Sequence, residues 1–106
     1  MQYCFMNSQR HGTCYFEFQQ GTFQGIYWKD TSIYLHADDF DRLHLYKIFT
    51  PDFRYYGETV ITKTQWHQIF LCAQKIGGET KKVIDEIDLW AQECFNTETE
   101  FTILGI

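Results

Sequence analysis

The sequence lacks the features that mark membrane, secreted and disordered proteins. One proline and seven glycines in 106 residues are too few for a flexible linker or a low-complexity segment. No apolar run approaches the ~20 residues that a membrane-spanning helix needs. The start of the chain, MQYCFMNSQRHG, has no basic segment followed by an apolar core, so it does not read as a signal peptide. We therefore predict a cytoplasmic protein that does not bind a membrane.

Catalytic, metal-binding and phosphate-binding motifs are also missing. The four cysteines form no Cys-x-x-Cys pair and the four histidines form no HxxxH or HExxH pair, so zinc ligation is not indicated. Gly21 and Gly25 come without the third glycine or the Lys-Ser/Thr of a phosphate-binding loop. Cys72 and Cys94 fall on the apolar faces of expected helices, which indicates buried thiols and not nucleophiles. The sequence thus predicts no catalytic residue, no metal ion and no cofactor.

Positive charge is scarce. Lysine and arginine total 9 against 14 aspartates and glutamates, which gives a formal net charge of -5. A protein that binds the phosphate backbone needs clustered basic side chains, so we predict no nucleic-acid partner. A basic protein partner fits the charge, because opposite electrostatic fields speed the encounter of two proteins. Many proteins also carry such a charge for solubility alone.

Aromatic residues, by contrast, are abundant, since ten Phe, seven Tyr and three Trp make up 19% of the chain. With 44% apolar residues the chain can bury a core, and we predict one domain over residues 1–106. Runs of β-branched and aromatic residues predict strands at 3–6, 13–19, 22–28, 32–36, 52–62 and 100–105. A turn is expected at Gly21 and an irregularity at Gly57.

Three segments predict helices. The first covers residues 37–49, with Asp38 or Asp39 as its N-cap; its second half could equally be extended. Thr62-Lys-Thr-Gln65 fits a capping box, and the apolar residues after it share one helical face: Trp66, Ile69, Phe70, Ala73 and Ile76. A glycine pair at 77–78 separates this helix from another over 79–95. The order of elements predicts an α+β fold, a mostly antiparallel sheet with about three helices packed on one face.

The last of these helices contains the sequence VIDEIDLWAQE, residues 83–93. Its apolar residues form one inward stripe: Val83, Ile84, Ile87, Trp90, Ala91 and Cys94. Leu89 falls in the middle of the polar arc, next to Asp88 and four residues from Asp85 and Glu93. A single exposed leucine is common, but an apolar anchor in an acidic rim suits a basic groove on another protein. We predict that Asp85, Asp88, Leu89 and Glu93 bind a partner, and that reversing the three charges weakens binding without disturbing the fold.

A second set of candidate partner-binding residues lies nearer the middle of the chain. It comprises the acidic cluster at the start of the first helix and one aromatic residue: Asp38, Asp39, Asp41 and Tyr56. The pairs Tyr27-Trp28 and Tyr55-Tyr56 would place aromatic rings on both faces of their strands, one of which can remain exposed.

Two other functions stay open at this point. His36 and His44 flank the acidic cluster, and a carboxylate–histidine site there would indicate a small ligand-binding or enzymatic domain, with a pocket between the sheet and the helices. A structural subunit is the third possibility, and its sign would be a large two-fold apolar interface.

The segments GIYW, SIYLHADDFDRL, RYYGETVITKTQW and FTILGI, in a small acidic α+β domain, carry one resemblance. In these features the chain resembles the immunity proteins of bacterial contact-dependent growth inhibition and other polymorphic toxin systems. The resemblance implies a non-enzymatic protein that binds a cognate toxin domain and occludes its active site or an adjacent surface. Many such toxins are nucleases with a basic substrate groove, in which acidic side chains take the place of phosphates. None of the segments is a diagnostic motif, so no functional residue is carried over.

Overall fold

The computed structural model describes residues 2–49 and 51–106, and it confirms the α+β class that the sequence predicts. Within these residues, five strands form one sheet, paired antiparallel throughout. In chain order the elements are β1 (Cys4–Phe5), the 3₁₀ helix η1 (Asn7–Gln9), β2 (Tyr15–Gln20), β3 (Ile33–His36), α1 (Ala37–Arg42), the 3₁₀ helix η2 (Leu45–Lys47), β4 (Glu58–Thr62), α2 (Lys63–Ile76), α3 (Gly78–Cys94) and β5 (Glu100–Leu104).

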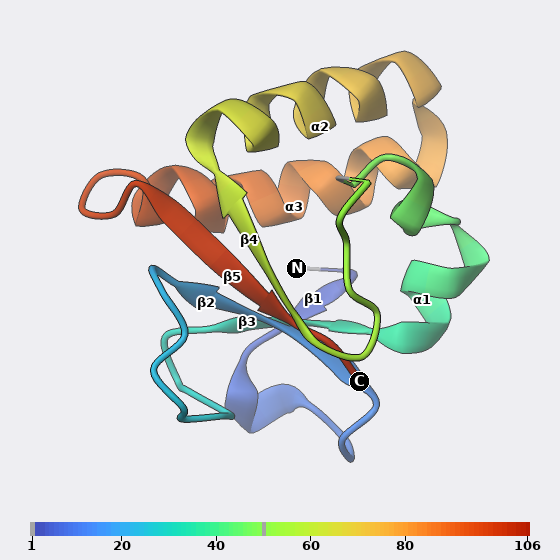
Figure 1. The fold of residues 1–106 in the computed structure, drawn as a ribbon. Helices are drawn as coiled ribbons and strands as arrows, with labels where there is room; N and C mark the ends of the chain where they lie inside the picture. Colours follow the sequence, from blue (N-terminus) through green and yellow to red (C-terminus); the bar gives the residue numbers. More distant parts are fainter. Residues whose placement is uncertain (1, 50) are drawn as a thin grey trace.

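The sheet has the strand order β1-β3-β2-β5-β4, so β1 and β4 are its two edges (Figure 1). Helices α2 and α3 lie side by side over one face, and α1 lies at one end of the sheet (Figure 1). The segments 6–14 and 21–32 lie on the opposite side of the sheet (Figure 1). In the described part of the chain, none of the helices combines the length and the apolar character needed to cross a bilayer.

The hairpin of α2 and α3 follows the predicted signals closely. The Thr62 side chain accepts a hydrogen bond from the Gln65 amide at 3.2 Å, and the Gln65 side chain accepts one from the Thr62 amide at 2.9 Å. This is the predicted capping box, and it starts α2 at Lys63. Gly77, with φ +70°, ends α2 in a backbone conformation that glycine adopts easily. The predicted stop at the glycine pair is confirmed, although α3 already begins at Gly78.

The core lies between the sheet and this helix pair. Phe16 and Phe18 on β2 point toward the helices and are fully buried, because alternate side chains of a strand point to opposite faces. Trp66 on α2 packs against Phe101 on β5, with ring centroids 5.5 Å apart. The predicted inward stripe of α3 is buried except for Trp90, which is half-buried: Val83, Ile84, Ile87, Ala91 and Cys94.

The outer face of the sheet buries a carboxyl group. Glu17 on β2 is 2% exposed, and its two oxygens accept hydrogen bonds from five donors. The donors are the backbone amides of Trp28 and Lys29, and the side chains of Gln19, Ser32 and Tyr34, at 2.7–3.3 Å. Burial, and then the Glu17 carboxylate, raise the pKa of Tyr34. A buried carboxyl group is tolerated only when it is hydrogen-bonded in this way, so the network holds the segment 21–32 against the sheet.

The prediction of a strand at 22–28 is wrong, because this segment is irregular in the structure. The amide of its last residue, Trp28, and the amide of Lys29 just after it donate to the Glu17 side chain and not to the backbone of a neighbouring strand. Trp28, with φ +60°, stacks on Tyr34 at 5.8 Å, and the Arg10 guanidinium lies 3.9 Å from the Trp28 ring centroid. Nonlocal packing therefore outweighs the β-propensity of the segment.

The strand predicted at 52–62 is also too long, because β4 begins only at Glu58. Tyr55 and Tyr56 lie in the turn before it, so their predicted placement on two faces of a strand is wrong. Tyr55 packs edge-on against Phe16 at 5.2 Å, which draws this turn onto the end of the core.

Three smaller predictions are also corrected. The N-cap of α1 is His36, whose Nδ1 accepts from the Asp38 amide at 3.0 Å, so neither Asp38 nor Asp39 is the cap. Ile76 is 57% exposed, because α2 ends there and no core side chain packs over it. Cys72 is half-buried instead of buried, whereas Cys94 is buried as predicted.

We expect Glu17→Ala to lower the free energy of unfolding by about 3 kcal/mol or more, because it leaves several buried donors without an acceptor. Urea denaturation followed by fluorescence measures the change. Glu58→Ala is the matched control. Glu58 is an exposed carboxylate in the same cross-strand row, Glu17–Leu104–Glu58. This variant should change the free energy of unfolding by less than about 0.5 kcal/mol. Equal losses in the two variants would contradict the role of the network.

Candidate binding surface

The outward face of α3 presents an isolated apolar side chain. Leu89 is 71% exposed, which fits its predicted place in the polar arc of the helix. Glu93, one turn later on the same face, is also exposed, and its carboxylate has no hydrogen-bond partner within residues 2–49 and 51–106. Leu89 and Glu93 together are therefore open to a partner.

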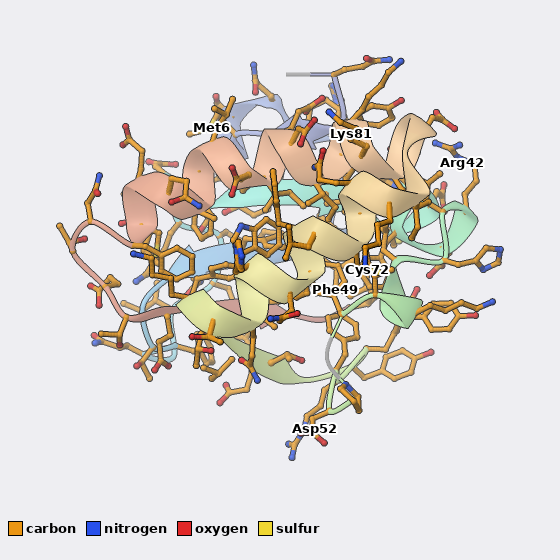
Figure 2. The ribbon with its side chains drawn as sticks, turned by 90° about the horizontal axis from the view of Figure 1, so that it is seen from above. Met6, Arg42, Phe49, Asp52, Cys72 and Lys81 are labelled. Atoms are coloured by element: carbon orange, nitrogen blue, oxygen red, sulfur yellow. The ribbon has the colours of Figure 1, made fainter. Side chains whose placement is uncertain are left out.

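Asp85, one turn before Leu89, is occupied by the protein itself. It accepts hydrogen bonds from Lys81 Nζ at 2.6 Å and from Gln74 Nε2 at 2.9 Å, the latter across the gap to α2. The bond from Lys81 is the main reason that the pKa of Asp85 is lowered. Lys81 lies at the α1 end of the hairpin, near Arg42, when the molecule is seen from above the helices (Figure 2). Asp85 thus links the two helices, and the ammonium group of Lys81 offsets its negative charge.

Asp88 also has internal partners and lies in a groove between α2 and α3. Its Oδ1 accepts from Trp66 Nε1 and from Gln92 Nε2, each at 2.9 Å. The groove has a volume of about 430 Å³ and is lined by Lys63, Thr64, Trp66, His67, Phe70, Asp88 and Gln92. Asp88 is half-buried, and this groove is a route by which a partner can reach it.

The edge of α3 that faces β1 has a structural role. Glu86 accepts hydrogen bonds from the backbone amides of Gln2, Tyr3 and Cys4 at 2.9–3.2 Å. The carboxylate thereby fixes the N-terminal segment to the helix. Of the carboxylates on α3, Glu93 and the groove-facing side of Asp88 remain for a partner.

The second predicted set lies around α1 and the turn before β4. Asp41 accepts a hydrogen bond from the Tyr55 hydroxyl at 2.8 Å, and Tyr56, 83% exposed, packs edge-on against Tyr55 at 4.9 Å. Burial and the bond to Asp41 raise the pKa of Tyr55 to about 12. The structure therefore brings Asp41 and Tyr56 together, although they are far apart in the sequence.

Asp39 and Asp38, on the same helix as Asp41, have other contacts. Arg42 bonds to Asp39 at 2.9 Å and to Glu79, at the start of α3, at 2.7 Å. Asp38 is exposed beside the His36 imidazole. Leu89 is ten residues beyond Glu79 along α3, a distance of about 15 Å. The eight predicted residues thus form two surfaces and not one.

A further exposed surface adjoins Tyr56, the one residue of it that was predicted to bind a partner. Four apolar side chains project around the β4 edge on the outer side of the sheet: Tyr27, Tyr56, Val60 and Ile106, with exposed fractions of 42–83%. Two adjoining hollows of about 290 and 440 Å³ share Tyr27, Leu104, Gly105 and Ile106. One sign of this surface was predictable from the sequence, the expected exposure of one residue in each of the pairs Tyr27-Trp28 and Tyr55-Tyr56. The rest depends on where the segment 21–32 ends on the sheet.

The space between sheet and helices, where a ligand pocket was considered, is filled by buried side chains. His36 caps α1 and His44 is exposed with φ +52°, and neither lines any of five surface hollows found among the described residues. In the same residues, histidine, cysteine and acidic side chains form no group of three or more that could hold a metal ion.

In comparisons with protein-family models, curated proteins and solved structures, no match to the chain was found.

The contacts of Asp88 change what we expect of charge reversal on α3. Asp88→Lys places a cation beside the Trp66 N–H and removes its acceptor, so we expect a loss of about 1–3 kcal/mol in the free energy of unfolding. Asp88→Asn keeps an acceptor oxygen and should lose less. Urea denaturation of both variants tests this, and equal stability of Asp88→Lys and the wild type would show that the bond to Trp66 is dispensable. The triple reversal at Asp85, Asp88 and Glu93 would therefore disturb the fold.

We also expect acid to weaken the contacts that the carboxylates of α3 make with α1, with α2 and within α3. Hydrogen bonds from Arg42 and Tyr3 lower the pKa of Glu79, and the bond from Lys81 lowers that of Asp85. Because the folded pKa values lie below the ordinary 4.5 and 3.8, these groups stabilise the fold fully above those values. The contribution is lost as the pH falls through the lower folded values. The wild type should have a higher urea midpoint than Lys81→Gln at neutral pH, and this difference should shrink at acid pH. A difference that is the same at both pH values would exclude Asp85 as a contributor.

Proposed function

We propose that the protein is a non-enzymatic immunity protein, which binds a cognate toxin domain and blocks its active site or an adjacent surface. We take the toxin domain to be a basic nuclease. The observation that carries the proposal is Leu89, a leucine 71% exposed on an otherwise polar helix face, with the exposed Glu93 one turn away.

The energetics of binding favour this surface. Burying a leucine side chain in a partner contributes about 1.5–3 kcal/mol, and the centres of interfaces are typically apolar with a polar rim. The α2–α3 groove beside it offers a half-buried phenyl ring, Phe70, and the Asp88 and Gln92 side chains on one wall. A basic side chain of the partner could pack its stem on Phe70 and donate to Asp88.

The charge of the chain supports a basic partner. The net charge of -5 attracts a positively charged domain over a distance of about 8–10 Å at physiological salt. Such attraction raises the association rate, which matters for an inhibitor that must capture a toxin before the toxin meets its substrate.

The test requires the toxin domain, for which the product of the adjoining gene is the first candidate. We expect the wild-type chain to restore growth of cells that express this domain and to bind it in a one-to-one complex by calorimetry. Leu89→Lys should weaken binding at least about tenfold, or 1.4 kcal/mol. Glu93→Lys tests the contribution of the acidic charge. It should slow association with the toxin domain and reduce the salt dependence of the association rate.

Ile76→Lys is the matched control, because Ile76 is also an exposed aliphatic residue on the helix hairpin, 57% exposed, at the far end of α2. It should leave binding unchanged. Failure of the wild-type chain to bind or protect would refute the proposed function for that toxin. Normal binding by Leu89→Lys would refute the α3 surface while leaving the function standing.

A further inference from the structure

The free edge of the sheet at β4 has unpaired backbone groups. The Gly105 amide donates to the Gly57 carbonyl at 2.7 Å, and the register continues from Glu58–Leu104 to Thr62–Glu100. Backbone groups of an antiparallel strand alternate in direction, so those of Thr59 and Ile61 point to β5. Those of Glu58, Val60 and Thr62 point away from the sheet. The Thr62 amide already donates to Gln65, whereas Glu58 and Val60 have no backbone partner at this edge in the described part of the chain.

The other edge is protected. Strand β1 has two residues, and the amides of Gln2, Tyr3 and Cys4 are taken up by Glu86. Proteins commonly shorten or cover an edge strand, because an open edge pairs with other strands. β4, with five residues, is the longer edge, and Val60 at its centre is 42% exposed.

We propose that two copies of the chain pair along β4 in an antiparallel two-fold dimer, so that their sheets become one continuous sheet. With the two-fold axis at Thr59, Glu58 of one copy lies opposite Val60 of the other. Each such pair exchanges both of its N–H···O=C bonds. The arrangement therefore satisfies all the free edge groups of Glu58 and Val60 in both copies and requires none from the capped Thr62 amide.

The side chains around β4 also fit a second copy. The surface is apolar through Val60, Tyr56, Tyr27 and Ile106, and such side chains can pack against themselves across a two-fold axis. Its ionic residues are one cation and one anion, Arg54 and Glu58, which line the same hollow; neither forms an ion pair within the described residues. Chains of net charge -5 repel each other, so a self-contact needs a nearly neutral surface such as this one.

A strand of another protein could also add to this edge. Two observations favour the second copy. The backbone groups of Glu58 and Val60 that face the edge can pair with those of Val60 and Glu58 in another copy across a two-fold axis. The surface also has no net charge that would select a basic partner. The dimer leaves Leu89 and the α2–α3 groove on the helix side, so it does not depend on the proposed toxin-binding function.

Sedimentation equilibrium of the wild-type chain, at concentrations up to the millimolar range, tests the dimer. We expect a mass of two chains at high concentration. Val60→Glu should raise the dimer dissociation constant at least about tenfold, because it places a second carboxylate directly opposite Glu58 of the other copy and removes the apolar contact. Leu89→Glu is the matched control and should leave the dissociation constant unchanged. A monomer throughout, or a Val60→Glu dimer of normal strength, would overturn the proposal.

Amide hydrogen exchange of the wild-type chain gives a readout that does not depend on any variant folding. The Glu58 and Val60 amides should exchange slowly in the concentrated dimer and quickly on dilution. A dimer in which these two amides exchange fast would overturn pairing at β4. Protection that appears only when a toxin domain is added would assign the edge to that protein and equally overturn self-pairing.

Discussion

The Glu17 carboxyl group is the constraint on which the outer half of the structure depends. A carboxyl group in the middle of a sheet, 2% exposed, requires donors from outside its own strand. The segment 21–32 supplies backbone amides at Trp28 and Lys29, and Ser32 and Tyr34 follow at the start of β3. This holds an aromatic segment over β2 and β3. The β4 side of the outer face stays uncovered, which explains why exposed apolar side chains gather there.

The sequence was sufficient to predict the helix hairpin because its signals are local. The Thr62–Gln65 capping box, the apolar spacing from Trp66 to Ala73 and the glycine pair act within one or two turns. The sheet content and the terminal strand followed from β-propensity, and the α+β class from the order of elements. The exposure of Leu89 was likewise predictable, because a helical wheel depends on the helix alone.

What the sequence could not predict depends on nonlocal partners. The segment 22–28 has the composition of a strand, but the amide of its last residue, Trp28, and that of the following Lys29 donate to Glu17 in β2. On α3, Asp85 and Asp88 looked as free as Glu93, yet Gln74 and Trp66 of α2 bond to them. Neither residue type nor spacing shows which carboxylate on an acidic helix face will accept hydrogen bonds from side chains of a neighbouring helix. The surface around β4 was missed for the same reason, since it joins four distant segments.

The position of β5 has a consequence for how the protein is made. β5 follows every other strand in the sequence, yet it lies between β2 and β4 and bonds to both. On the ribosome, β2 and β4 therefore have no shared partner until residues 100–104 have emerged. Until then only the pairings of β3 with β1 and β2 are possible, and β4 has no strand partner. The last strand of the sequence is therefore the one that closes the sheet, and before it is available β2 and β4 each keep an edge open to other strands.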